Sequence, residues 1–156
     1  MNIYKTIFLP GKHYHVFNHA ISQELLFKDA ENYYYFIRRL KDHVDKYVEI
    51  KAYCLMPNHY HLLIRVKKFS SDEVHVHEKV LQAFGNFQNG YAKAINKRYF
   101  RKGRLFQSSI CRVYLQEQSD VYRVAEYIRQ NPVLHGFSKT PDAWKHLWPK
   151  PSNKAA

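Results

Sequence analysis

Residues 50–66, "IKAYCLMPNHYHLLIRV", predict a β-hairpin, and this hairpin decides which fold the rest of the chain can complete. The runs 50–56 and 60–66 are apolar and have the length of strands. Pro57 and Asn58 between the two runs are typical turn residues. We therefore expect two consecutive antiparallel strands in the middle of the chain.

The segments on either side of the hairpin complete an alternating order of strands and helices. Hydrophobic patterns predict strands over 13–20 and 108–115 and helices over 30–48, about 76–99 and about 119–130. Asp29 is placed to cap the first helix, and the Asn131-Pro132 pair to end the last one. The order β-α-β-β-α-β followed by a helix predicts an α+β fold, a ferredoxin-like sandwich with an antiparallel sheet.

The length of 156 residues suits a single domain over 1–156, with a core at about 13–136 and a C-terminal tail over 137–156. The first residues lack the apolar run of a secretory signal, and no apolar run is long enough for a membrane span. Cys54 and Cys111 lie in strand-like segments without a CxxC pair, which excludes a zinc ribbon. These features predict a cytoplasmic protein with reduced, buried thiols and no membrane partner.

The charge of the chain points to a polyanionic partner. Lys and Arg number 25 against 13 Asp and Glu, which gives a formal net charge of +12. Nucleic acid is the commonest partner of so basic a small domain. Charge alone fits a merely basic soluble protein equally well.

The motif His-x-His occurs three times, so the spacing alone is weak evidence for a metal site. His75 and His77 fall near the start of a predicted helix, where residues two apart point to different faces. His59 and His61 begin a predicted strand, where residues two apart share a face, as two ligands of one cation must. The first and third strands are neighbours in this fold, so His15 can lie near the pair. Hydrogen-bonded imidazoles in a half-buried strand remain the alternative.

Residues 52–66, "AYCLMPNHYHLLIRV", closely resemble the signature of the REP-associated tyrosine transposases, which belong to the single-tyrosine branch of the HUH endonuclease and transposase superfamily. Four further segments match in the family's order. They are "YHVFNHA" (14–20), "LFKDAENYYYFIRRL" (26–40), "GRLFQSSI" (103–110) and "VAEYIRQNPV" (124–133). Together the five segments span nearly the whole predicted core.

The resemblance implies a reaction and its residues. Members of this family cut and rejoin single-stranded or hairpin DNA through a 5′-phosphotyrosine intermediate, with a divalent metal, Mg²⁺ or Mn²⁺. Carried onto this chain, the nucleophile is Tyr127 and the metal ligands are His59 and His61. Asn131 lies four residues after Tyr127, on the same helix face, and is the third implied ligand. Gln130, three residues after Tyr127, is a weaker substitute.

One departure from the family stands at the end of the first strand. Many relatives carry an Arg-Gly pair there, and this chain carries His19 and Ala20. A phosphate contact from this position is therefore in question. Whether His15 or His19 joins the site is also open, as are the base that activates Tyr127 and the choice between a monomer and a homodimer with shared sites.

A basic, aromatic segment after the second helix is the predicted DNA-binding surface. Its cations are Lys97, Arg98, Arg101, Lys102 and Arg104. Tyr99, Phe100 and Phe106 are interleaved with them, and aromatic rings can stack unpaired bases. We expect Tyr99 and Phe106 in the core and the basic side chains on DNA, with a solvated basic loop as the alternative.

The sequence thus favours a metal-dependent tyrosine transposase acting on single-stranded or hairpin DNA. One alternative is a non-catalytic nucleic-acid-binding module on the same fold, which needs neither Tyr127 nor a metal. The other is a metal-dependent hydrolase in which His59 and His61 activate water. That hydrolase needs a nearby carboxylate, and Glu126 lies on the wrong side of its helix if Tyr127 faces the metal.

Overall fold

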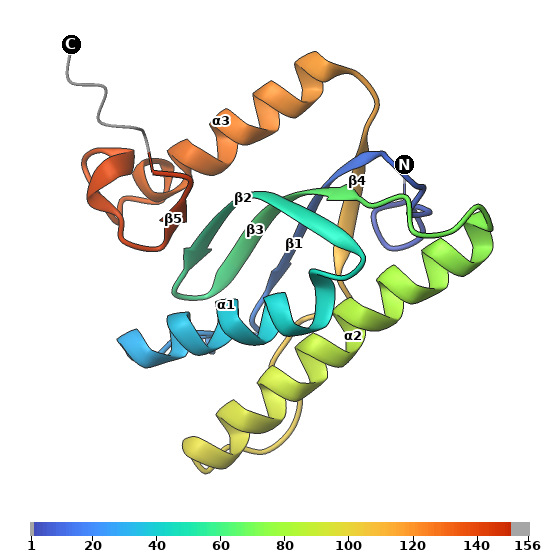
Figure 1. Cartoon of the computed structure of the whole chain (residues 1–156). Helices are drawn as coiled ribbons and strands as arrows, with labels where there is room; N and C mark the ends of the chain where they lie inside the picture. Colours follow the sequence, from blue (N-terminus) through green and yellow to red (C-terminus); the bar gives the residue numbers. More distant parts are fainter. Residues whose placement is uncertain (1, 151–156) are drawn as a thin grey trace.

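The chain forms a five-stranded antiparallel sheet with helices on both faces in the computed structural model, which describes residues 2–150 (Figure 1). The strands are β1 (His13–His19), β2 (Val48–Met56), β3 (His59–Val66), β4 (Cys111–Leu115) and β5 (Leu147–Trp148). Their order across the sheet is β4-β1-β3-β2-β5. The first four strands have the ferredoxin-like order, so the predicted fold class is confirmed. The short edge strand β5 was not predicted and comes from the tail.

Two helices, α1 (Ala30–Val44) and α2 (Glu73–Arg98), cover one face of the sheet, and α3 (Gln118–Leu134) covers the other (Figure 1). A short 3-10 turn, η1 (Pro141–Ala143), follows α3. No helix within residues 2–150 is both long and apolar enough to cross a membrane.

The larger core lies between the sheet and the α1–α2 layer. One stripe of α1 enters it, because Tyr33, Phe36, Leu40 and Val44 recur at helical spacing and are all buried. Tyr99 and Phe106 also pack against this core, as the sequence predicted.

The smaller core lies between the other face of the sheet and α3. Its strand residues are buried apolar side chains of β2, β3 and β4, among them Cys54 and Leu63. Val121 and Ile128, seven residues apart on one stripe of α3, close this core from above. Because this core is small, α3 covers only part of the sheet face beneath it, and its flanking residues stay accessible.

The last helix is longer than the sequence predicted. We expected Asn131 and Pro132 to end it, but α3 runs on to Leu134 with Pro132 inside. The helix is terminated by Gly136, which has a left-handed φ of 75° and donates its N–H to the carbonyl of Val133. The N–H of Phe137 bonds to the carbonyl of Pro132, completing a Schellman ending. Proline costs a helix one hydrogen bond, and here the burial of Asn131 and Pro132 and the hydrogen-bonded ending at Gly136 offset that loss.

Three other boundaries differ from the prediction by three residues or more. Helix α1 ends at Val44 because β2 begins at Val48, whereas the sequence extended this helix to residue 48. Strand β4 begins at Cys111 rather than 108. Helix α2 begins at Glu73, three residues earlier than expected, because Asp72 caps it by accepting the N–H groups of residues 74 and 75.

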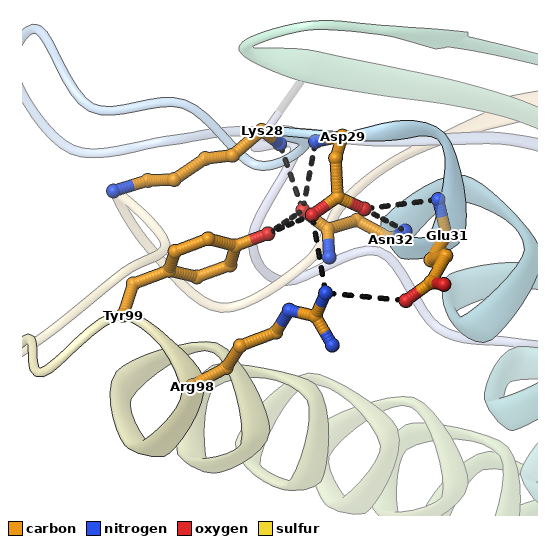
Figure 2. A network of polar contacts seen from close by, with 6 residues as sticks. All are labelled: Lys28, Asp29, Glu31, Asn32, Arg98 and Tyr99. Carbon is orange, nitrogen blue, oxygen red and sulfur yellow. Dashed lines mark hydrogen bonds and ion pairs between the residues drawn. The ribbon is translucent and has the colours of Figure 1, made fainter.

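A polar network joins the start of α1 to the end of α2 (Figure 2). The Asp29 carboxylate caps α1 and also accepts a hydrogen bond from the hydroxyl of Tyr99. Arg98 lies 3.5 Å from Asp29 and 3.1 Å from Glu31. The Tyr99 hydrogen bond, the backbone donors of the cap and the Arg98 charge together hold the pKa of Asp29 below its usual range. This network fixes the point at which the chain leaves α2.

Replacing Tyr99 by Phe should lower the free energy of unfolding, because the Asp29 carboxylate loses a donor. A lowered carboxyl pKa contributes stability above the unfolded value of about 4 and loses it as the pH falls. The difference between wild type and Tyr99→Phe should therefore shrink between pH 7 and pH 3 in urea denaturation. Tyr34→Phe, at an exposed ring of α1, is the matched control. An equal loss in both variants would contradict the role of the network.

Candidate active site

The pairing of β1 with β3 gathers four histidines on the sheet face that α3 covers. In the antiparallel register His19 lies opposite His59, and Phe17 lies opposite His61. Side chains alternate along each strand, so His15 and His19 share a face with His59 and His61. Neighbouring Tyr60 points the other way, into the larger core. His15 and His19 of β1 thus form one cluster with the His59–His61 pair of β3.

The four imidazole rings are in direct contact. The rings of His59 and His61 lie 5.1 Å apart, nearly perpendicular to each other. His19 stacks on His59 with ring centres 4.8 Å apart. Nε2 of His15 lies 2.9 Å from Nδ1 of His61, so one of these two nitrogens donates to the other. His15 and His19 therefore border the predicted ligand pair.

Helix α3 brings the other two predicted residues to this cluster, within the same chain. The ring of Tyr127 lies 5.5 Å from that of His61 and 6.0 Å from that of His15. Tyr127 is 42% exposed, so it is open to a ligand from solvent. Asn131, one turn further along α3, is fully buried, and its Oδ1 lies 3.2 Å from Nε2 of His59. Tyr127, His59, His61 and Asn131 are thus assembled by one protomer.

The contact between His59 and Asn131 brings two hydrogen-bond acceptors together. Nδ1 of His59 lies 2.7 Å from Oδ1 of Asn58, and only the imidazole N–H can donate there. In a neutral ring, Nε2 then carries a lone pair that faces the amide oxygen of Asn131. Among residues 2–150, Nδ2 of Asn131 is buried without a hydrogen-bond partner. A cation between the two acceptors, or an amide rotated to donate from Nδ2, relieves this contact.

Burial keeps the histidines of the site uncharged at neutral pH. It lowers the pKa of His61 to about 2, helped by the neighbouring His15, and lowers the pKa of both His15 and His59 to about 4. The pKa of His19 is lowered as well, by burial first and by His135 second. Neutral imidazoles are the form that binds a metal ion. Two such rings and one amide oxygen therefore fit a divalent cation that accepts both nitrogen and oxygen, such as Mn²⁺.

Among residues 2–150, no carboxylate joins these rings in a metal-binding arrangement. Within residues 2–150, no group of three or more His, Cys, Asp or Glu side chains is arranged to hold a metal ion. Glu126 accepts a hydrogen bond from Gln130 and lies 3.9 Å from Arg129, along the groove beside β5. The carboxylate that a metal hydrolase needs is therefore not next to His59 and His61 in the described part of the chain.

Two residues of the site were missed from the sequence. The ring of His135 lies 4.8 Å from that of His59. It follows Asn131 by one helical turn, and this signal was lost because the helix was predicted to end at Pro132. Asn58, which orients His59, was interpreted only as a turn residue.

The other histidines have separate places. His75 is exposed on α2, and Nδ1 of His77 accepts the backbone N–H of Phe8 at 3.1 Å. His13 stands at the far end of β1, opposite Arg65.

The five predicted DNA-contacting cations lie at the end of α2 and in the loop after it. Three arginines are tied to the protein itself. Arg98 pairs with the start of α1, Arg101 lies 3.1 Å from Glu24, and Arg104 donates to the carbonyl of residue 107. Lys97 and Lys102 are exposed, and in the described range 2–150 neither forms an ion pair. Within residues 2–150, the end of α2 and the following loop therefore present two cations without an ion pair and three that bond to the protein itself.

No protein-family model and no curated protein sequence matches this chain. Among solved structures, it is similar to a REP-associated tyrosine transposase bound to a REP hairpin, with a TM-score of 0.70 and 16% identity over 94% of this chain and 82% of that one. It also aligns with a Deinococcus radiodurans R1 protein whose transposase assignment is provisional, with a TM-score of 0.49 and 19% identity over 79% of this chain and 92% of that one. The fold is therefore that of the hairpin-bound transposase.

Acid should destabilise the protein through the buried histidines. Their pKa in the folded state lies below the unfolded value of about 6.5, so the unfolded chain binds more protons as the pH falls. Stability should be complete above about pH 6.5 and decline toward pH 4, with a melting temperature at least ~5 °C lower at pH 5 than at pH 7 in EDTA.

The variant His61→Leu should show a flatter melting-temperature profile over this range than wild type. His75→Leu, on the exposed side of α2, is the control and should keep the wild-type slope. The same slope in wild type and His61→Leu would argue against the buried, neutral state of His61.

Proposed function

We propose that this protein is a single-tyrosine transposase of the REP-associated type, which cuts and rejoins single-stranded or hairpin DNA. The observation that carries the proposal is the position of Tyr127 beside His61 of its own chain, within the cluster that also holds His59. The sequence resemblance assigns the nucleophile and the ligands to these same positions. The shared fold and the net charge of +12 support a DNA substrate.

Tyr127 supplies the nucleophile in this mechanism. Its phenolic oxygen attacks the phosphorus of the scissile phosphodiester, a new P–O bond to tyrosine forms, and the P–O3′ bond breaks. The products are a 5′-phosphotyrosine and a free 3′-OH, and the proton lost by the phenol balances the one gained by the 3′ oxygen. The reverse reaction with a 3′-OH reseals DNA without an external energy source, because the covalent link conserves the phosphodiester energy.

A divalent cation bound by His59, His61 and Asn131 would offset the negative charge on a nonbridging phosphate oxygen. Residues of the chain itself orient the ligands of that site and keep them uncharged. Asn58 holds the His59 ring so that its Nε2 faces inward, and burial keeps both imidazoles neutral. We expect Mn²⁺ to support activity at least as well as Mg²⁺, since imidazole is not a preferred magnesium ligand.

The position of α3 supports a site within one chain. Val121 and Ile128 anchor the helix in the smaller core, and this holds Tyr127 above the sheet of the same protomer. A monomer then suffices for the chemistry, and a homodimer is not needed to complete the site. We also propose a cytoplasmic location, where cellular DNA is accessible.

The two alternatives account for fewer observations. A non-catalytic DNA-binding module gives no reason for an exposed tyrosine beside two neutral histidines. A metal hydrolase lacks, among residues 2–150, a carboxylate at the histidine pair.

Incubation with labelled single-stranded hairpin DNA and Mn²⁺ should yield a protein–DNA adduct that survives denaturing electrophoresis. Tyr127→Phe should abolish the adduct, because the ring remains but the attacking oxygen is gone. Tyr122→Phe, on the same helix at a ring that is 68% exposed, should form as much adduct as wild type. No adduct from wild type across varied hairpins would overturn the proposal, and cleavage without an adduct would favour the hydrolase.

Adduct formation should require the predicted ligand set. His59→Ala and His61→Ala should each slow it on the order of 100-fold, and EDTA should stop it reversibly. Loss of the orienting Asn58 should cost about 10-fold or more. His75→Ala serves as the histidine control. Full activity of wild type in EDTA would remove the metal from the proposal but leave the tyrosine step intact.

A further inference from the structure

Phe100 stands out as an aromatic side chain presented to solvent. It is 96% exposed, more than any other large hydrophobic side chain of residues 2–150. Its backbone φ is 54°, in the left-handed region that residues other than glycine rarely adopt. A large apolar ring in a strained backbone position gains nothing from the fold, so its exposure invites a functional explanation.

The strained position is imposed from both sides of Phe100. On one side, Tyr99 caps α2 through its N–H to the carbonyl of Ile95, and its hydroxyl bonds to Asp29 (Figure 2). On the other side, the N–H of Arg101 bonds to the carbonyl of Asn96 at 2.9 Å. The chain must therefore reverse at Phe100, and the ring is directed outward.

The loop after Phe100 is itself held rigidly. The Arg101 guanidinium donates to Oδ1 of Asn96 at 2.7 Å and to the carbonyl of Arg104 at 2.8 Å. Nδ2 of Asn96 donates to the carbonyl of Gly103 at 2.9 Å. A base that stacks on Phe100 would thus meet a pre-formed surface and would not have to order the loop.

The surroundings of the ring suit a nucleic acid better than an apolar protein partner. Lys97 and Lys102 flank Phe100 in the sequence, are exposed, and form no ion pair within residues 2–150. One isolated ring in a basic segment is not a continuous apolar patch of the kind that protein partners cover. An aromatic face for a base, with cations for the adjoining phosphates, is the arrangement used to bind single-stranded nucleic acid.

The same loop connects Phe100 to the candidate active site. The N–H of Ile21 bonds to the carbonyl of Leu105 at 2.8 Å, and the N–H of Gln107 bonds to the carbonyl of His19 at 2.9 Å. His19 stacks on His59. Residues 101–107 therefore run from the exposed ring to the strand end that carries the histidine cluster, and Figure 1 shows this segment returning from the end of α2 toward the sheet.

We propose that Phe100 is a base-stacking site for an unpaired nucleotide of the DNA, with Lys97 and Lys102 contacting the adjoining phosphates. The inference rests on the proposed function for its substrate class, and it does not depend on the cleavage step. It assigns Phe100 a role in discriminating single-stranded from fully paired DNA.

The test is fluorescence of 2-aminopurine placed singly at unpaired positions of hairpin and single-stranded DNA, titrated with the full chain in EDTA. Stacking on Phe100 should quench one position. Phe100→Gly should abolish that quench and weaken binding about 5- to 100-fold, the range for loss of one stacked base. It should fold at least as well as wild type, because glycine accepts the positive φ without strain. Phe100→Trp should retain the quench.

Phe137→Ala, at an exposed ring outside the loop, is the matched control and should bind as wild type does. Lys102→Ala should weaken binding while the quench at saturation persists. Wild-type affinity and quench in Phe100→Gly would overturn the proposal, as would an equal loss of binding to fully paired DNA. Binding of an acidic peptide with the same dependence on Phe100 would instead identify a protein partner.

The outcomes separate this inference from the proposed function. Quenching without any covalent adduct would support the stacking site and contradict the proposed transposase chemistry. An adduct without quenching at any unpaired position would support the chemistry and contradict the stacking site.

Discussion

The antiparallel pairing of β1 with β3 is the constraint on which the rest of the structure depends. Both faces of β3 are buried, so a slip of one residue would exchange the side chains of the two cores. The histidines would then enter the apolar layer beneath α1 and α2. Buried polar contacts oppose this slip, because the hydroxyl of Tyr60 and the amide of Asn18 both bond to Oε1 of Gln88, at 2.7 and 2.9 Å. A slip would leave these groups unpaired in the core.

Helix α3 converts that sheet face into a site. It is held by a few apolar contacts over a small core, and the cover it provides is partial. Asn131 is fully buried against His59, whereas Tyr127 stays half-exposed at the margin of the same surface. Within one turn of α3, the buried Asn131 therefore orders the site, and the half-exposed Tyr127 can contact a ligand. The cover by α3 also explains why the histidines are neutral, since the helix excludes water from their rings.

Much of this architecture could be predicted from local sequence patterns. The hairpin, the capped and striped helix α1 and the presence of the long helix α2 follow from short-range patterns that tertiary packing did not override. The errors have a common cause. The end of α3 at Pro132 and the extension of α1 over residues 45–48 were predicted from local propensity. In the structure, the Schellman ending at Gly136 sets the end of α3, and the pairing of β2 sets the end of α1. The edge strand β5 escaped prediction because it pairs with a distant segment, and His135 escaped because the helix was predicted to end before it.

By itself, the sequence determined the order of the elements, the basic charge, and the placement of His59 and His61 on one strand face, because alternation and helical periodicity act over a few residues. Its resemblance to a known family selected Tyr127 and Asn131 among many similar side chains. Only the tertiary structure decided that β1 adds His15 and His19 to the cluster and that α3 delivers Tyr127 within the same chain. It alone showed that Phe100 points outward. These features follow from strand register, from helix docking and from a chain reversal held by distant partners, none of which a local pattern encodes.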